Sequence, residues 1–369
     1  MSLQVHYQPY KLNFRFEAGT SRGVLSEKVS WLIKIYDDSE PSLVGLGECG
    51  PLAGLSIDAR PDFEETLQSI CQSFNQLDLE LYSWNIPIIL EQLIGNQWPS
   101  IRFGFESAML DYLNGCKSVI FSNDFVAAHR RIPINGLIWM GTKEFMLRQI
   151  EEKIAAGFDT LKLKIGALDF EQERSILKHI RSHFGSHEIT IRVDANGAFQ
   201  PFEAKDKLQK LAEFEIHSIE QPIKAKQLAL MAELCETSPI PIALDEELVG
   251  TFDYAEKRRL LKSLKPQYII LKPTLLGGFE LTREWVETAQ RLDIGWWITS
   301  ALESNVGLNA IAQFTAEFDN QLPQGLGTGQ LYHNNIPSPL VIEKGQLYHD
   351  AYSSWDFGVL NATRISTTA

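Results

Sequence analysis

The chain has 369 residues, of which 44% are hydrophobic and 22% charged, a composition that suits a globular protein with a full-sized core. Its formal net charge of -13 disfavours a nucleic-acid binder, because such proteins carry basic patches that neutralise phosphates. No stretch reaches the roughly 18 consecutive apolar residues of a membrane helix, and the N-terminus lacks the apolar core of a signal peptide, so we expect a cytoplasmic protein without a membrane segment.

The first third of the chain has the pattern of an α+β domain. Residues 29–36 (VSWLIKIY) alternate in a way that favours an antiparallel strand, with 43–49 as its partner. Apolar residues recur at helical spacing in 62–74 and 100–113, and Ser100 is a candidate N-cap of the second helix. The four cysteines in the whole chain form no C-x-x-C pair, so we predict reduced, mostly buried thiols.

From about Pro133 short apolar runs alternate with amphipathic segments. The eight runs are IPINGLI, TLKLKI, ITIRVDAN, IHSIEQP, IPIALDE, QYIILKP, WWITSA and QGLG. The helix candidates between them are residues 142–156, 169–184, 202–213, 225–236, 253–263, 279–291 and 305–316. This alternation is typical of right-handed βαβ units, and eight strands in about 200 residues favour a closed barrel over an open sheet.

These patterns predict an α/β chain with a (β/α)7β-type TIM-like barrel and an α+β capping domain. We place the capping domain at residues 1–128, the barrel at 129–332, and at 333–369 a tail that returns to the capping domain and pairs with it. The capping domain is therefore predicted to be built from both ends of the chain.

Polar residues end successive apolar runs at intervals of 25 to 30 residues, the length of a βα unit. They are Lys164, Asp194, Glu220, Asp245, Lys272 and Ser300. Strand ends are often polar simply because loops begin there, which is the plain interpretation of any one position. The carboxyl ends of barrel strands converge on one face, however, and that face carries the active site. We therefore expect these six side chains to share one pocket.

Lys162 and Lys164 stand two residues apart, so their side chains point to the same side of a strand. K-x-K alone is common on solvated strands, but the apolar neighbours Leu161, Leu163 and Ile165 favour a buried one. We expect the two ammonium groups to lower each other's pKa, which would make a lysine usable as a base near neutral pH.

Asp194 in VDANGAF, Glu220 in IEQP and Asp245 in ALDEE form a trio of acids with no Cys or His beside them. Oxygen-only ligands suit Mg²⁺, with Mn²⁺ as a substitute. The plain alternative is that each acid pairs separately with a lysine or arginine. Glu246 is a candidate for supporting a ligand or lysine from behind. Lys272, on the sixth strand, is expected across the barrel from Lys164, so that two cationic groups flank a metal-bound carboxylate substrate.

The motifs KLKIG, VDANGAF, IEQP, ALDEE and ILKP, in this order and spacing, resemble the enolase superfamily, specifically its muconate lactonising subgroup. The resemblance implies Lys164 as the reacting base, Lys162 as its neighbour, Lys272 as the opposing lysine and the three acids as Mg²⁺ ligands. LKPTLLGGF, ITSALESNVG and QGLGTGQL are similar to the subgroup's dehydratases, which act on a succinylated cyclohexadiene carboxylate.

For substrate contacts the resemblance implies Ser300, Glu303 and Ser304 near the succinyl end, with Asn196 as a further candidate. Ser304 is equally suited to cap the following helix. Residues 16–23 and 47–54 correspond to loops that close over the substrate in this family, although a plain hairpin loop fits 16–23 as well.

Several alternatives remain open from the sequence. An N-succinylamino-acid racemase or a cycloisomerase would share every metal ligand and both opposed lysines. The stretch GLGTG lacks the D-x-D acids that hold the substrate amine in dipeptide epimerases, which disfavours that activity. A Schiff-base aldolase using Lys272 and a non-catalytic barrel are more remote.

Overall fold

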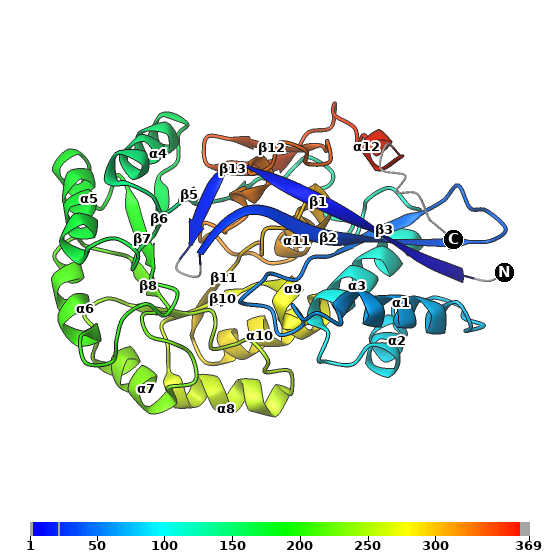
Figure 1. Cartoon of the computed structure of the whole chain (residues 1–369), viewed down its shortest axis with the longest axis horizontal. Helices are drawn as coiled ribbons and strands as arrows, with labels where there is room; N and C mark the ends of the chain where they lie inside the picture. Colours follow the sequence, from blue (N-terminus) through cyan, green and yellow to red (C-terminus); the bar gives the residue numbers. More distant parts are fainter. Residues whose placement is uncertain (1–2, 21–22, 362–369) are drawn as a thin grey trace.

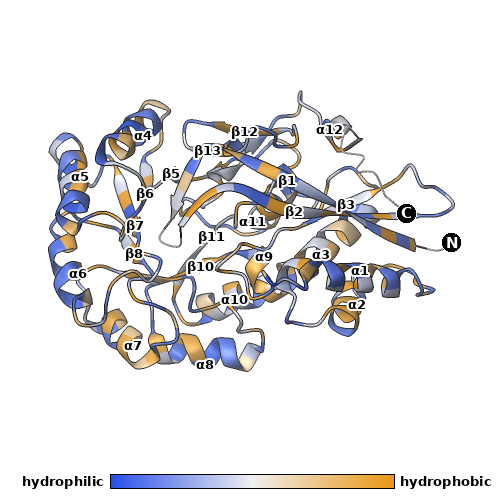
Figure 2. Ribbon diagram, in the orientation of Figure 1, coloured by the Kyte–Doolittle hydropathy of each residue, from blue (hydrophilic) through white to orange (hydrophobic). Residues whose placement is uncertain are grey.

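The computed structural model describes residues 3–20 and 23–361. Figure 1 shows two parts side by side, a capping part with a long antiparallel sheet and a barrel ringed by helices. Hydrophilic residues run along the outer helices, while the strands inside the ring are mostly apolar (Figure 2). The α/β architecture predicted from the sequence is confirmed, with the barrel mouth turned toward the capping sheet.

The capping part consists of a three-stranded sheet and three helices. The strands, in the order β1-β2-β3, are β1 (Leu3–Thr20), β2 (Gly23–Asp37) and β3 (Gly45–Cys49). The helices are α1 (Phe63–Phe74), α2 (Ile86–Leu93) and α3 (Pro99–Leu113). Helix α3 packs closely on β3, since a Cβ on Gly47 would lie 1.9 Å from the carbonyl oxygen of Gly104. Glycine at this position is what permits the close packing.

Two local predictions for the capping part were wrong. Helix α3 begins at Pro99 with Trp98 as its N-cap residue, because Ser100 uses its N–H and hydroxyl to donate to Asp58 Oδ2, at 2.8 and 2.6 Å. The predicted loop 16–23 is largely strand, since β1 continues to Thr20 after a register shift between Asn13 and Ala18. Positions 21 and 22 of that loop lie outside the described residues.

The barrel contains seven parallel strands paired in chain order. They are β5 (Gly136–Ile138), β6 (Thr160–Lys164), β7 (Thr190–Asp194), β8 (Ser218–Glu220), β9 (Ile242–Leu244), β10 (Tyr268–Leu271) and β11 (Gly295–Ile298). The predicted eighth strand, QGLG, is represented by two residues that bridge the sheet edges: Gln324 pairs with Ile134 and Gly325 with Thr299. These bridges close the ring.

Helices cover the outside of the sheet at the positions that the periodicity predicts. They are α4 (Lys143–Ala155), α5 (Phe170–His183), α6 (Ala204–Ala212), α7 (Leu228–Thr237), α8 (Tyr254–Leu264), α10 (Phe279–Arg291) and α11 (Asn305–Thr315). Two short helices complete the barrel part: α9 (Pro273–Leu276) and the 3-10 turn η1 (Gly327–Gln330).

The tail contacts the capping sheet, as expected, but its two strands pair at the start of the barrel. Strands β12 (Leu340–Glu343) and β13 (Gln346–His349) form a hairpin whose second strand pairs with β4 (Ile132–Pro133), at the start of the barrel. The tail also contacts β1 of the capping sheet directly, since the Tyr10 hydroxyl donates to the Asn334 carbonyl oxygen at 2.5 Å and Asn334 Nδ2 donates to the Lys11 carbonyl oxygen at 2.7 Å. The short α12 (Gly358–Asn361) ends the described chain. The domain boundaries at 128 and 332 stay predictions.

The four cysteines are free thiols, and three of them, Cys49, Cys71 and Cys235, are buried. This agrees with the reduced, mostly buried thiols expected from their spacing. None of the helices in the described ranges has the length and apolarity needed to cross a membrane.

Candidate active site

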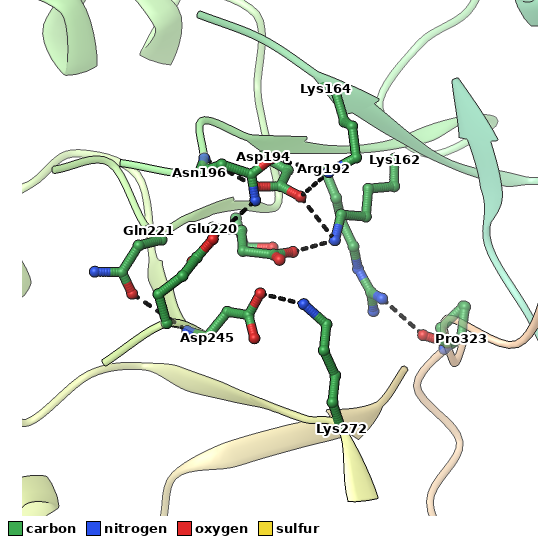
Figure 3. A network of polar contacts seen from close by, with 12 residues as sticks. Lys162, Lys164, Arg192, Asp194, Asn196, Glu220, Gln221, Asp245, Lys272 and Pro323 are labelled. Carbon is green, nitrogen blue, oxygen red and sulfur yellow. Dashed lines mark hydrogen bonds and ion pairs between the residues drawn. The ribbon is translucent and has the colours of Figure 1, made fainter. Parts of the chain in front are cut away.

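The polar residues that end the strands converge at the barrel mouth (Figure 3). Lys162 and Lys164 come from β6, and Asp194 and Glu220 end β7 and β8. Asp245 directly follows β9, and Lys272 directly follows β10. The carboxylates lie between Lys162 and Lys164 on one side and Lys272 on the other (Figure 3). The alternation of β6 therefore points both of its lysines to the inside of the ring.

Direct ion pairs connect the lysines with the acids. The Nζ atoms of Lys162 and Lys164 each lie 3.1 Å from Asp194 Oδ2. Lys162 also pairs with Glu220, and Lys272 pairs with Asp245. Ammonium groups thus separate the three carboxylates, which would otherwise repel one another in a buried site.

A cavity of about 280 Å³ opens onto this network. The barrel contributes Lys162, Lys164, Asp194, Asn196 and Lys272 to its wall. The capping part covers it with residues from two segments, which are Gly23, Val24, Leu25, Leu52, Ala53, Gly54 and Leu55. The predicted lid segment 47–54 therefore contributes to the cavity wall. The other predicted segment, 16–23, contributes through its last residue, Gly23, and is continued in the wall by Val24 and Leu25 of β2.

The electrostatics of the network differ from the prediction. Burial alone would lower the pKa of Lys162, but Asp194, Glu220 and Asp245 outweigh it and raise that pKa. The pKa of Lys272 is likewise raised, because Asp245 and Glu220 outweigh its burial. From the sequence, a neighbouring lysine was expected to lower the pKa of Lys162. That prediction was wrong, because it did not consider the three carboxylates that surround the Lys162 ammonium group.

The acids divide into two kinds. Burial raises the pKa of Asp194, but Lys162, Lys164 and Lys272 outweigh it and hold the pKa well below its usual range. Burial and the charge of Asp194 raise the pKa of Glu220 well above its usual range, and Lys162 offsets this only in part. The surrounding charges therefore stabilise the Glu220 carboxylate less than that of Asp194, so an added cation would stabilise Glu220 more.

The geometry of the mouth can be compared with known proteins. Residues 146–351 match the family model described as Enolase C-terminal domain-like. The chain belongs to the enolase superfamily. The o-succinylbenzoate synthase of Desulfotalea psychrophila is 42% identical over 374 residues, covering 94% of this chain and 98% of that protein.

Solved structures agree with this family membership. The crystal structure of MenC from Desulfotalea psychrophila covers 94% of this chain and 100% of that chain, with a TM-score of 0.84 and 41% identity. A dipeptide epimerase from Enterococcus faecalis was crystallised with Mg and the dipeptide L-Leu-L-Tyr. Its match covers 95% of this chain and 97% of that chain, with a TM-score of 0.82. At 23% identity this second structure shows the fold alone. The resemblance inferred from the motifs is confirmed.

Enzymes of the enolase superfamily generally use Mg²⁺. The three acids offer oxygen donors, which suit this ion. Glu220 Oε1 is buried without a hydrogen-bond partner among the described residues, as expected of an oxygen that a cation completes. Within those residues no three acidic, His or Cys side chains already stand at ion-binding spacing. Lys162 and Lys272 would have to withdraw from the carboxylates for the ion to bind.

Asn196 lies next to the reacting groups. Its Oδ1 accepts a hydrogen bond from Lys164 Nζ at 2.9 Å, and its Nδ2 donates to Glu246 Oε1 at 3.1 Å. Asn196 lines the cavity, whereas Glu246 is not part of the cavity wall and contacts Asn196 through this hydrogen bond. This arrangement is compatible with the expected supporting role of Glu246, which stays a prediction.

The three residues expected at the succinyl end have different surroundings. Ser300 lines the cavity, and its hydroxyl donates to Glu303 Oε2. Glu303 does not line the cavity, because its carboxylate accepts that bond and another from the Thr274 hydroxyl. Ser304 caps α11 by accepting from the Val306 N–H at 3.1 Å. Of the three, only Ser300 lines the cavity, and Ser304 has the helix-capping role that was the alternative expected from the sequence. Their contacts with a substrate stay predictions.

Other cavity residues were missed by the sequence analysis. Asn135, Leu137 and Trp139 all line the wall and stand two residues apart along β5 and its flanks. The same alternation that identified the two lysines of β6 could have identified them. Thr328, in η1, also lines the cavity and donates to the Ser300 hydroxyl at 2.8 Å. Its position depends on the turn after the barrel closes, which no sequence period marks.

A second buried charge cluster lies between the capping sheet and the barrel, and we call it the cap–barrel junction (Lys28, Glu48 and Glu303). Glu48 accepts hydrogen bonds from the N–H groups of Ser304 and Gly307, at 2.9 and 3.0 Å, and from the Ser304 hydroxyl. Burial lowers the pKa of Lys28, which Glu48 and Glu303 offset only in part. A carboxylate of the capping sheet thus caps a barrel helix, α11, whose preceding loop carries Ser300.

Proposed function

We propose that the chain is an o-succinylbenzoate synthase, which dehydrates 2-succinyl-6-hydroxy-2,4-cyclohexadiene-1-carboxylate in menaquinone biosynthesis. The observation that supports this proposal best is that Lys164 and Lys272 line one cavity from opposite sides of the carboxylates. The likeness to the synthase of Desulfotalea psychrophila over 94% of the chain supports the same substrate. The reaction is a carbon–oxygen lyase reaction on a small-molecule carboxylate.

Lys164 is the proposed base. Its side chain is 13% exposed, against 7% for Lys162 and 10% for Lys272, so it is the most accessible of the three. In the neutral form its Nζ would take the proton from the carbon next to the carboxylate. The same Nζ, now an ammonium, would return a proton to the departing hydroxyl on the same face, which makes the elimination syn.

Lys272 would stabilise the negative charge that develops as the proton leaves, from the opposite wall. Asp194, Glu220 and Asp245 are the proposed holders of Mg²⁺, with Mn²⁺ as a substitute. The bound ion supplies positive charge that lowers the barrier to forming an enediolate. Lys162 would keep the carboxylates in place, since it contacts Asp194 and Glu220 at once.

The wall of the cavity suits the ring of the substrate. Trp139, Leu25 and Leu52 provide apolar surface in the same cavity as the charged groups. Covering by the capping segments would exclude water from the reacting atoms and strengthen the electrostatic interactions there. Ser300 and Thr328 remain candidates for contacts with the succinyl end.

A racemase acting on N-succinylamino acids is a second candidate, favoured by the same opposed lysines. Two bases on opposite faces can remove and replace a proton with inversion. Dipeptide epimerisation is disfavoured, because the cavity residues Gly325, Gly327 and Thr328 of the eighth-strand region include no acid. Deuterium exchange at the alpha carbon of N-succinylamino acids in D₂O would separate racemisation from dehydration.

The direct test is incubation of the purified protein with the cyclohexadiene substrate and Mg²⁺, following the loss of the diene's ultraviolet absorbance. We expect turnover that EDTA abolishes and that added Mg²⁺ restores. Full activity in EDTA, with borohydride trapping of substrate on Lys272, would favour an aldolase instead. Metal binding without turnover of any tested carboxylate would indicate a non-catalytic barrel.

A further inference from the structure

Two histidines stand one helical turn apart on α5, on the outside of the barrel. His179 and His183 have ring centroids 4.7 Å apart, so the i, i+4 spacing of the helix brings the two rings together. Helix α5 lies in the outer layer, at the end of the molecule away from the capping sheet (Figure 1). His183 is exposed and His179 is partly exposed, so an ion from solvent can reach both.

The hydrogen bonds of His183 determine which ring nitrogen is free. Its Nδ1 lies 2.9 Å from the backbone carbonyl oxygen of His179. A carbonyl oxygen only accepts, so Nδ1 carries the proton and Nε2 keeps its lone pair. Histidines that bind metals commonly donate their other N–H to a carbonyl or carboxylate in this way. The His179 ring makes no hydrogen bond within the described residues, so no hydrogen bond holds its nitrogens away from the same ion.

The end of the helix also favours a cation, against the basic side chains Lys178 and Arg181 that lie close to the pair in the sequence. His183 is the last residue of α5, where the partial negative charge of the helix C-terminus attracts positive ions. Arg181 is directed elsewhere, since its guanidinium donates to the carbonyl oxygens of Phe214 and Ile189 at 2.8 Å each. The net charge of -13 adds a favourable background.

We propose that His179 and His183 bind one divalent transition-metal ion, with water completing its coordination. Imidazole nitrogen suits Cu²⁺, Ni²⁺ and Zn²⁺, and the intrinsic order of affinity places Cu²⁺ first. Mg²⁺ prefers oxygen ligands and does not compete for this pair. In the described part of the chain no third His, Cys, Asp or Glu joins the pair, so the ion is exchangeable. The site is separate from the barrel mouth, because α5 runs back from the carboxyl end of β6 toward the opposite face.

The test uses the full chain saturated with Mg²⁺, titrated with Ni²⁺ in a calorimeter. His179→Gln and His183→Gln are the test variants, and His187→Gln is the matched control, since His187 is exposed but has no ring contact with the pair. We expect the wild-type chain and the control to bind one Ni²⁺ that each test variant binds at least about tenfold more weakly. Cu²⁺ should displace Ni²⁺, and a tenfold excess of Mg²⁺ should not.

Ni²⁺ binding that survives unchanged in either test variant would overturn the proposal, because a single imidazole would then account for it. Loss of the same binding in His187→Gln would also overturn it. Thermal unfolding of the variants without metal checks that the helix is intact. Ni²⁺ should raise the unfolding temperature of the wild-type chain and of His187→Gln more than that of either test variant, since the ion binds the folded pair.

Discussion

The barrel mouth and the cap–barrel junction are both buried clusters of lysines and carboxylates, but they differ in how the oxygens are satisfied. At the junction, Glu48 accepts from two backbone N–H groups and a hydroxyl, and Glu303 accepts from Ser300, Thr274 and the backbone. At the mouth, Glu220 contacts the ammonium group of Lys162 and has no hydrogen bond from the described residues.

This difference separates a structural role from a ligand-binding one. A carboxylate whose oxygens accept directed hydrogen bonds is stable as it stands and holds two parts of the molecule together. A buried carboxylate that contacts an ammonium group but accepts no directed hydrogen bond gains more from a further cation. Burial of charge alone would not distinguish the two clusters, since Glu48 and Glu220 are both buried.

The largest expected effect is at the mouth. Lys164→Ala should reduce turnover of the cyclohexadiene substrate by about 10³-fold or more, because the proposed base is lost. Lys205→Ala, which breaks an exposed ion pair with Glu233, should leave turnover unchanged. Steady-state rates at saturating Mg²⁺ provide the measurement. Near-normal turnover in Lys164→Ala would remove this lysine from the mechanism.

Asp194→Asn should weaken Mg²⁺ binding by an order of magnitude or more, because it removes a charged ligand and one partner of both Lys162 and Lys164. Calorimetric titration with Mg²⁺ measures this directly. The matched control is Asp206→Asn, since Asp206 pairs with Lys210 on the exposed face of α6. Equal Mg²⁺ affinity in both variants would contradict the ligand assignment.

The mouth and the junction also differ in how far the sequence predicts them. The mouth residues follow local rules, since each ends a strand and the two lysines of β6 alternate with apolar residues. The junction follows no local rule, because Glu48 and Ser304 are 256 residues apart and meet only when the two parts pack. Glu303 was expected near the substrate from the family resemblance, and in the structure its carboxylate accepts hydrogen bonds from Thr274 and Ser300.

Two further failures have the same origin. The pKa of Lys162 was expected to fall because only the neighbouring lysine was considered, whereas three carboxylates from other strands surround it. The tail was expected to pair with the capping sheet, and it does contact β1, but its hairpin pairs with β4 through a tertiary proximity that strand propensity does not encode. Periodicity predicted the barrel because each βα unit is a local pattern, and the contacts between units are not.

At the junction the expected effect is on stability rather than on metal binding. Glu48→Gln replaces an acceptor by a donor facing the N–H groups of α11 and leaves Lys28 with Glu303 alone. We expect a loss of about 3 kcal/mol in the free energy of unfolding, measured by urea titration, with Mg²⁺ affinity unchanged. Glu27→Gln, at an exposed ion pair with Lys11, should cost under about 1 kcal/mol.

A double variant guards against a Glu48→Gln chain that fails to fold. Lys28→Met with Glu48→Gln removes the buried ammonium that the single change leaves underpaired, and should regain part of the lost stability. The effect of Lys28→Met alone on the free energy of unfolding provides the reference. If Lys28→Met lowered that free energy equally in the wild-type chain and in Glu48→Gln, the pairing of the two charges would have no role. A loss of Mg²⁺ affinity in Glu48→Gln would show that the two clusters are not separate.

The smallest expected effect is the pH dependence contributed by Glu106, a second capping-part carboxylate that contacts a barrel helix. It accepts from the N–H groups of Phe279 and Glu280 at the start of α10, at 2.6 and 3.3 Å. Burial nevertheless raises its pKa to about 7. Between the unfolded and folded pKa values the folded chain binds more protons, so this group makes the protein less stable as pH rises.

Comparison with Glu106→Gln isolates this contribution from other titrating groups. Between about pH 5 and about pH 7 the wild-type chain should lose about 2 kcal/mol more unfolding free energy than the variant, because only the wild type must ionise a buried carboxyl in that window. Urea titrations at several pH values give both curves. Parallel curves would mean that the α10 N–H groups stabilise the Glu106 carboxylate fully, and the contact would then resemble the satisfied oxygens of Glu48.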